Sequence, residues 1–309
     1  MAVLPMKKIE ICAMKRDRKA ILEKLQSLGM VEIQTNNEET DDFRKMSTTS
    51  QRAKYEKRVQ NTDEALQILD KYVPEEKSIF ASLEGRQEAS EADIQEIIAG
   101  RRDYNCKVKK IQGISKDIAG CEAGIVKCQV AIDGLVPWLN MDIPINTTGT
   151  EKTDVMIGTM PPGLTETDIH GYISSAEPEM AGYTVAVVGS DKDQTCMVAI
   201  ALKPVSQRVE EILRSHGFTR ISYFSRRTPE QKMEKYKEDI REFEQCIEDK
   251  TKELVSLADD RNKLRLLADY YRIRADKYQV LGGLLQSKST FVISGYVLER
   301  DADRAAAGC

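Results

Sequence analysis

The stretch from Met233 to Leu285 carries apolar residues at alternating steps of three and four along nearly its whole length. Only Lys250, Arg261 and Gly282 interrupt this spacing. A hydrophobic repeat of seven residues that persists over so many turns is typical of a coiled-coil helix. It predicts an uninterrupted helix over residues 228–287, with a seam that includes Ile240, Phe243, Ile247, Leu254, Leu264, Tyr271 and Tyr278.

Such a seam needs a partner helix, and an earlier part of the chain has the same spacing. Its seam residues include Ile111, Ile118, Ile125 and Ile132, and a shorter piece from Tyr55 to Val73 stops at Pro74, which does not continue a helix. We therefore expect an outgoing helical arm over residues 46–137 that is broken near 74–86. We expect it to pair antiparallel with the returning helix of the same chain. A parallel homodimer stays open, because heptads do not identify their partner.

Two segments that flank the arms share one order of elements. Residues 7–14 alternate like a strand, 17–28 form an amphipathic pattern that Gly29 ends, and 30–35 begin a second strand; residues 196–202, 206–216, Gly217 and 218–224 repeat this order. Residues 154–159, 165–175 and 183–188 predict a further strand, helix and strand. A last strand at 290–298 is expected to lie beside Ile9 and Ile11.

The fold class that these patterns predict is α+β, with two small α/β lobes joined by a long antiparallel coiled coil within one chain. We expect a proximal lobe from residues 1–45 plus 288–309 and a distal lobe from residues 138–227, with the two arms at 46–137 and 228–287. The residues after 300 begin another helix, and we expect the natural chain to continue beyond Cys309.

Composition limits the classes of function. Charged residues make up 31% and aromatic residues 6% of the 309 residues, which suits long solvated helices. The net charge of −4 gives no general attraction to nucleic acid or anionic membranes. Seven scattered cysteines favour reduced thiols in a cytosolic setting. No apolar run is long enough to span a bilayer.

Residues that could carry chemistry are few. The only histidines, His170 and His216, have no carboxylate or cysteine at a spacing typical of a ligand set or a catalytic pair. There is no phosphate-binding glycine loop and no nucleophile motif. We therefore expect no enzyme activity in this chain alone, no cofactor, no metal and no small-molecule substrate.

Three short motifs, and the helix segment Ile21–Leu25 between the first two of them, resemble the V-type or A-type ATPase subunit I, called subunit a in eukaryotes. They are the opening Leu4–Ile9, the segment Leu28–Ile33, and Phe291–Glu299, where the family's usual Gly-Trp-Val-Pro is similar to Gly295, Tyr296, Val297 and Leu298. The order of lobe, arm, lobe, arm and strand also resembles this family over essentially the whole chain. The membrane half, which holds the ion path in this family, is absent from the sequence, so no ion-path residue is transferred.

The resemblance implies a non-catalytic stator component at the cytoplasmic face of a membrane, which resists torque and docks peripheral-stalk heterodimers and other rotary ATPase subunits. Exposed sheet edges and helix ends of the lobes are the expected docking places. Candidate docking residues lie in the distal lobe: Phe218, Arg220, Tyr223, Arg226 and Arg227.

Two alternatives remain. One is a soluble coiled-coil adaptor with no rotary machine, which a natural chain that continues into apolar membrane segments would exclude. The other is a helical arm that binds nucleic acid through the basic residues Arg101, Arg102, Lys107, Lys109 and Lys110. We expect no nucleic-acid binding, because acidic residues accompany most basic runs.

Overall fold

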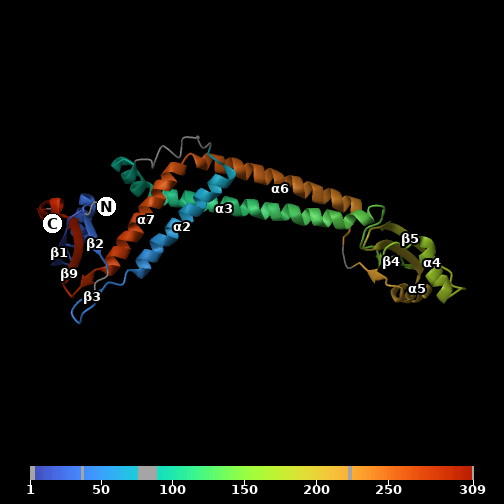
Figure 1. Cartoon of the computed structure of the whole chain (residues 1–309). Helices are drawn as coiled ribbons and strands as arrows, with labels where there is room; N and C mark the ends of the chain where they lie inside the picture. The colour runs from blue at the N-terminus through green and yellow to red at the C-terminus, as the bar shows by residue number, and fades with distance from the viewer. Residues whose placement is uncertain (1–3, 36–37, 76–88, 222–224, 308–309) are drawn as a thin grey trace. The chain divides into compact units, whose positions relative to one another are not determined.

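A computed structural model describes residues 4–35, 38–75, 89–221 and 225–307 (Figure 1). The chain divides into two compact units, unit 1 from Met1–Ser115 with Lys252–Cys309 and unit 2 from Lys116–Thr251. Each unit contains one antiparallel sheet together with helices, so the fold class is α+β, as the sequence predicts. The division into four segments at residues 45, 137, 227 and 287 stays a prediction.

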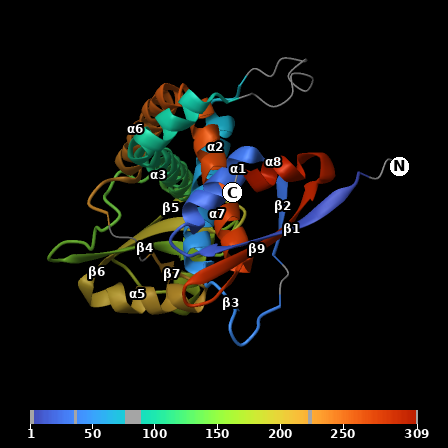
Figure 2. The ribbon, with the colours of Figure 1, turned by 90° about the vertical axis from the view of Figure 1, so that its left-hand side faces the viewer.

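The sheet of unit 1 is built around the last strand of the chain, β9 (Thr290–Leu298). β1 (Met6–Met14) pairs with it along its full length, and β2 (Val31–Gln34) and β8 (Leu285–Gln286) also pair with it; β3 (Arg44–Lys45) pairs with β8. Figure 2 shows β1 beside β9. Ile9 lies opposite Gly295 and Ile11 opposite Ile293, which confirms the expected pairing of the two ends of the sequence.

One helix covers a face of this sheet. α1 (Arg18–Leu28) ends at Gly29, whose φ of 63° is a left-handed conformation that favours glycine. Its apolar side buries Leu22 and Leu25 against Phe291 and Ile293 of β9. After β9 the chain forms the short 3₁₀ turn η2 (Glu299–Asp301) and the helix α8 (Ala302–Ala307).

The longer helices of unit 1 form a bundle. α2 (Thr49–Tyr72) lies antiparallel to α7 (Arg261–Gly283), with contacts from Thr48–Tyr278 at one end to Asp70–Arg261 at the other. The first part of α3 (Glu91–Leu135) joins them, because Asn105 donates a hydrogen bond to the Tyr271 hydroxyl of α7 and Gln112 donates one to Glu64 of α2. The buried side chains of the bundle include Ala65, Leu69, Ile97, Tyr104, Val108, Ile111, Leu254, Leu264, Leu267, Ala268 and Tyr271.

The returning arm differs from the expected uninterrupted helix. It consists of α6 (Pro229–Ala258) and α7, which a turn at Asp259 and Asp260 separates. Aspartate is a poor helix former. Asp260 occupies the N-cap position of α7, but its carboxylate makes no capping hydrogen bond and contacts Lys107 instead. The break allows α7 to pair with α2, an arrangement that the heptad spacing alone does not reveal.

Unit 2 has a sheet in the order β5-β6-β4-β7, formed by β5 (Tyr183–Ser190), β6 (Thr195–Leu202), β4 (Thr153–Met160) and β7 (Thr219–Arg220). α4 (Glu166–Ala176) and α5 (Lys203–Ser215) cover one face. The end of α3, the 3₁₀ turn η1 (Val136–Trp138) and the start of α6 cover the other through Leu135, Trp138 and Tyr236. Burial on both faces explains the nearly continuous apolar run of β6.

The two sheets share one topological feature. In unit 1, β1, α1 and β2 form a strand–helix–strand motif, and its two strands lie on either side of the antiparallel strand β9. In unit 2, β6, α5 and β7 form the same motif, and its two strands lie on either side of the antiparallel strand β4. Both central strands, β9 and β4, have a glycine next to the second strand of the motif. A Cβ atom at Gly295 would lie 2.4 Å from the Glu32 carbonyl oxygen, and one at Gly158 would lie 2.4 Å from that of Thr219.

In unit 2, α3 and α6 pair in the antiparallel direction that the sequence predicts. Asp117 of α3 forms an ion pair of 3.2 Å with Lys250 of α6. About two turns further along α3, a Cβ atom at Gly124 would lie 2.8 Å from the Phe243 ring of α6. The partner numbers fall as the α3 numbers rise, so the two helices run antiparallel. Within the described part of the chain, no helix has the length and apolar character needed to cross a membrane.

Candidate docking surfaces

The predicted seam residues differ in burial between the two units. In unit 1, Ile111, Leu254, Leu264 and Tyr271 are buried and Tyr278 is half-buried. In unit 2, Ile118 is buried, whereas the others are half-buried, namely Ile125, Ile132, Ile240, Phe243 and Ile247. A third helix in unit 1 encloses its seam, whereas an isolated pair of helices leaves the sides of the seam open to solvent.

Two of the interruptions in the seam have specific partners. Lys250 reaches Asp117 on the opposite helix. Arg261 is 4% exposed and donates to the carbonyl oxygens of Leu69, at 3.1 Å, and Val73, so its cation lies at the C-terminal end of α2. Cations are favoured there because the last carbonyls of a helix lack partners and the helix dipole is negative.

The predicted docking residues of the distal lobe do not form one exposed surface. Phe218 is 4% exposed and lies in the core beneath α4 and α5, so its side chain is not available to a partner; this corrects the expectation for Phe218. Arg220 is exposed but forms a two-point ion pair with Glu210, at 2.8 and 2.7 Å. Arg226 and Arg227 are exposed, and Tyr223 lies outside the described residues.

An apolar cleft that the sequence patterns did not predict lies in unit 1, between α1, β2 and α7. It has a volume of about 330 Å³. We name it the α1–α7 cleft, and its apolar lining consists of Leu22, Leu25, Val31, Ile33, Ile273 and Val280. Ile273 is 51% exposed at its edge, and Lys277 forms an ion pair of 3.6 Å with Glu23 across it. Clefts with an apolar floor and a charged rim fit the apolar side of an amphipathic helix.

A second apolar surface lies on the side of α3 that faces away from α6 in unit 2. Val126 and Val130 are 63% and 66% exposed, and Ala119 and Ala123 continue the same exposed stripe. We name these four residues the α3 outer stripe. Within unit 2, the exposed positions of α6 are instead charged or amide residues, which include Glu234, Glu238, Arg241, Glu242, Glu244, Gln245, Glu248 and Asp249. Solvent-exposed helix faces usually carry charged and polar residues, as α6 does, so the apolar composition of the α3 outer stripe is unusual.

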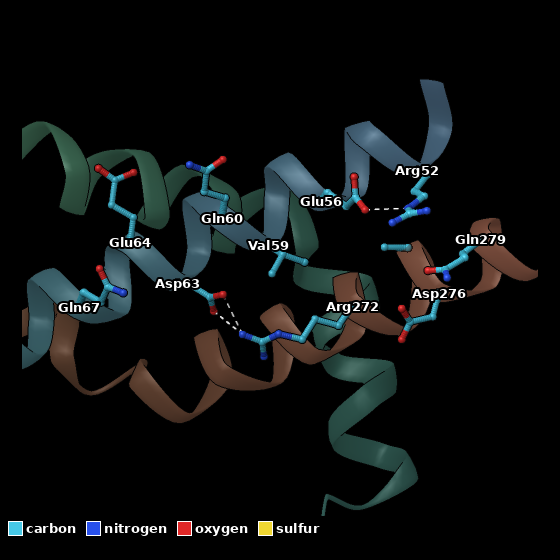
Figure 3. A pocket seen from close by; sticks show the side chains of 11 residues that line it. Arg52, Glu56, Val59, Gln60, Asp63, Glu64, Gln67, Arg272, Asp276 and Gln279 are labelled. Carbon is cyan, nitrogen blue, oxygen red and sulfur yellow. Dashed lines mark hydrogen bonds and ion pairs between the residues drawn. The ribbon is translucent and has the colours of Figure 1, made fainter. Parts of the chain in front are cut away.

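A polar groove between α2 and α7 has its charges paired within the protein. Arg272 contacts Asp63 at 2.6 and 2.8 Å, and Arg52 contacts Glu56 at 2.7 Å, as Figure 3 shows. The remaining ionisable residues of its lining, Glu64 and Asp276, are acidic. The groove therefore gives no cationic site for a phosphate group.

Most of the basic residues in the first part of α3 also form contacts within the protein. Arg101 donates to the Tyr270 hydroxyl at 3.3 Å, Lys110 contacts Glu253 at 2.7 Å, and Lys107 contacts Asp260. Arg102 and Lys109 remain exposed. Three of the five cations thus serve contacts between helices, which weakens the nucleic-acid alternative, since such binding needs cations free to reach phosphates.

The histidines lie in aromatic contacts of unit 2. The His216 ring stacks on Tyr172 at 4.1 Å, and the His170 ring lies 5.4 Å from that of Tyr183. Among the residues that the structure describes, no group of three or more histidine, cysteine or acidic side chains has the geometry to hold a metal ion.

No protein-family model matches the chain, and no curated protein matches it. One solved structure that is similar to it is described as the crystal structure of the cytoplasmic N-terminal domain of subunit I, homolog of subunit a, of V-ATPase. The sequence identity is 12% over 97% of this chain and 95% of that chain, and the TM-score is 0.48. These values do not establish a family for this chain.

Proposed function

We propose that this chain is a non-catalytic stator component of a rotary V-type or A-type ATPase, the cytoplasmic arm of its ion-translocating membrane subunit. It lies at the cytoplasmic face of the membrane, docks peripheral-stalk heterodimers and other subunits of the complex, and resists torque. In this role it needs no cofactor and no substrate of its own.

One observation carries the proposal. Two of the three motifs that resemble subunit I lie near the start of the sequence and the third lies near its end, yet all three meet in one sheet. Met6 to Ile9 of the opening motif pair with Gly295 to Leu298, and Val31 to Ile33 pair with Gly295 to Val297 on the other side of β9. Motifs that resembled the family by chance would have no reason to become neighbours in one strand ladder.

The exposed apolar surfaces supply the docking part of the proposal. Both the α1–α7 cleft and the α3 outer stripe have an apolar composition that suits the apolar face of a partner helix. The first lies in unit 1 and the second in unit 2, so a stalk could be held in each unit. Contacts in two units of one chain strengthen attachment, because the second contact is intramolecular once the first has formed.

A binding experiment with purified stalk heterodimers tests the proposal. We expect the whole chain to bind, and we expect Ile273→Glu in the cleft or Val126→Glu with Val130→Glu on the stripe to weaken binding about tenfold or more, since each places a charge in an apolar contact. Val255→Glu is the matched control, because Val255 is 52% exposed on α6 outside both surfaces. Absence of binding by the unmodified chain would refute the stator role, and equal binding by all variants would refute these surfaces.

A further inference from the structure

Two cysteines lie opposite each other in the helix pair of unit 2. Cys121 is four residues after Asp117 on α3, and Cys246 is four residues before Lys250 on α6. Asp117 and Lys250 are joined by their 3.2 Å ion pair on one side of the cysteines, and Gly124 meets the Phe243 ring on the other. In an antiparallel pair, contacts on both sides fix the register of the residues between them. Consistent with this register, Cys246 is the largest influence on the pKa of the Cys121 thiol, which it raises.

The environment of the two thiols distinguishes them from the other cysteines. Both are half-buried, so a small oxidant can reach them. Cys128 and Cys196 are buried, and burial first and then Asp191 raise the pKa of the Cys196 thiol to about 11, which makes it inert. Cys12 and Cys106 are exposed. Close approach of the helices at Gly124 also favours a short link, since a disulfide needs Cβ atoms about 4 Å apart.

We propose that Cys121 and Cys246 form an oxidisable pair, in which a hydroperoxide converts the two thiols into a disulfide that links α3 to α6. One thiol, as its thiolate, attacks the peroxide oxygen, forms a sulfenic acid and releases water. The second thiol then attacks the sulfenic sulfur, and the hydroxyl group leaves as a second water. The two electrons from the thiols reduce one hydrogen peroxide, so atoms and charge balance.

The link has a mechanical consequence that rests on the proposed function. An antiparallel pair without covalent links can slide along its seam, whereas a disulfide fixes its register. The bond would also close a long loop that contains the whole sheet of unit 2, which reduces the conformational freedom of the unfolded chain. Oxidation would therefore stiffen the helix pair of unit 2 at a half-buried position.

The nearby charges set the speed of the reaction. The hydrogen bond with Cys246, partial burial and the Asp117 carboxylate raise the pKa of the Cys121 thiol above its ordinary value, while the Lys250 ammonium acts in the opposite direction. Since the thiolate is the form that attacks the peroxide, oxidation should be slow at neutral pH and faster at alkaline pH.

The test uses the whole chain with dilute hydrogen peroxide, followed by alkylation of the remaining thiols and mass analysis of proteolytic peptides. We expect a peptide that joins Cys121 to Cys246, its loss in Cys121→Ser and in Cys246→Ser, and its persistence in Cys106→Ser. We also expect the oxidised chain to melt roughly 5 °C higher, with reversal by dithiothreitol and no shift in Cys246→Ser.

Two outcomes overturn the inference. One is that Cys121 and Cys246 remain open to alkylation after Cys12 and Cys106 have been oxidised. The other is that either cysteine links equally to several partners, which means that no defined pair exists. Cys121→Ala replaces Cys121→Ser if the serine variant does not fold. Stalk binding by a reduced Cys121→Ser, Cys246→Ser double variant separates this inference from the proposed function, because binding there is expected whether or not the disulfide forms.

Discussion

At the scale of single residues, the charged residue Arg261 in the apolar seam has a structural role. Arg261 stands where the heptad expects an apolar residue, and its guanidinium reaches the carbonyls at the end of α2. Glu75 at 3.2 Å and Asp70 at 3.7 Å add acidic partners near the surface. A buried guanidinium with this set of acceptors connects the start of α7 to the end of α2.

Replacement of Arg261 by Met should therefore lower the free energy of unfolding of unit 1 by about 2–4 kcal/mol, because the end of α2 loses its buried donor. Arg265→Met is the matched control. Arg265 is exposed, contacts the same Glu75 at 2.7 Å, and should change the free energy by less than about 1 kcal/mol. Denaturant unfolding of both variants measures the difference, and similar values for the two would argue against a specific role of Arg261.

The structural role of one glycine was predictable from the sequence, whereas the roles of three others were not. Gly29 was expected to end a helix, and its positive φ agrees. Gly158 and Gly295 gave no comparable signal, because their role is to let a neighbouring carbonyl approach across the sheet, and that neighbour is distant in sequence in each case. Gly282 breaks the heptad for a similar reason, since a Cβ atom there would lie 2.5 Å from Thr48 Oγ1.

At the scale of elements, an ion cluster joins α5 to β7. Glu210 on α5 accepts hydrogen bonds from Arg220 of β7 and from Arg214 of its own helix. The hydrogen bond from Arg220 holds the pKa of the Glu210 carboxyl below its ordinary value, with partial burial opposing it and Arg214 assisting. β7 has two residues and needs such support at the edge of its sheet.

This cluster makes the stability of unit 2 depend on pH. A carboxyl whose pKa is depressed in the folded state stabilises the protein above its unfolded pKa, near 4.5, and the contribution disappears as the pH falls through the folded value. Glu210→Gln should thus lower the free energy of unfolding by about 1 kcal/mol at pH 7 and by nearly nothing in strong acid. Equal losses at both pH values, measured by denaturant titration, would exclude the ion pair as the cause.

The elements themselves were largely predictable. The last strand has its expected bounds, and most of the predicted strands and helices of the lobes begin and end within a few residues of their predicted positions. The strand expected at 218–224 is shorter, because β7 covers only Thr219–Arg220, and residues 222–224 lie outside the described part of the chain. The returning arm was the main error. Its apolar spacing continues through Asp259 and Asp260, and spacing records which side of a helix is apolar, not whether the axis turns.

At the scale of the whole molecule, the fold of unit 1 depends on its final strand. β9 is the only described strand that contacts β1, β2 and β8 together, and Phe291 and Ile293 belong to the core under α1. The sheet of unit 2 uses only residues from within unit 2.

A chain that ends after Gly283 should therefore lose protection of the β1 and β2 amides from hydrogen exchange, while β4, β5 and β6 remain protected. A chain that ends after Leu298 retains β9 and is the control, since it lacks only η2, α8 and the residues that follow. Protection of β1 in the shorter chain would show that another strand can replace β9.

The sequence alone determined the periodic part of this protein: which segments are helices or strands, and which side of each is apolar, because local spacing sets both. The tertiary structure decided the rest, namely the break that pairs α7 with α2, the burial of Phe218, the α1–α7 cleft and the opposition of Cys121 and Cys246. Each of these depends on residues that are far apart in the chain, and contacts of that kind have no periodic signal in one sequence.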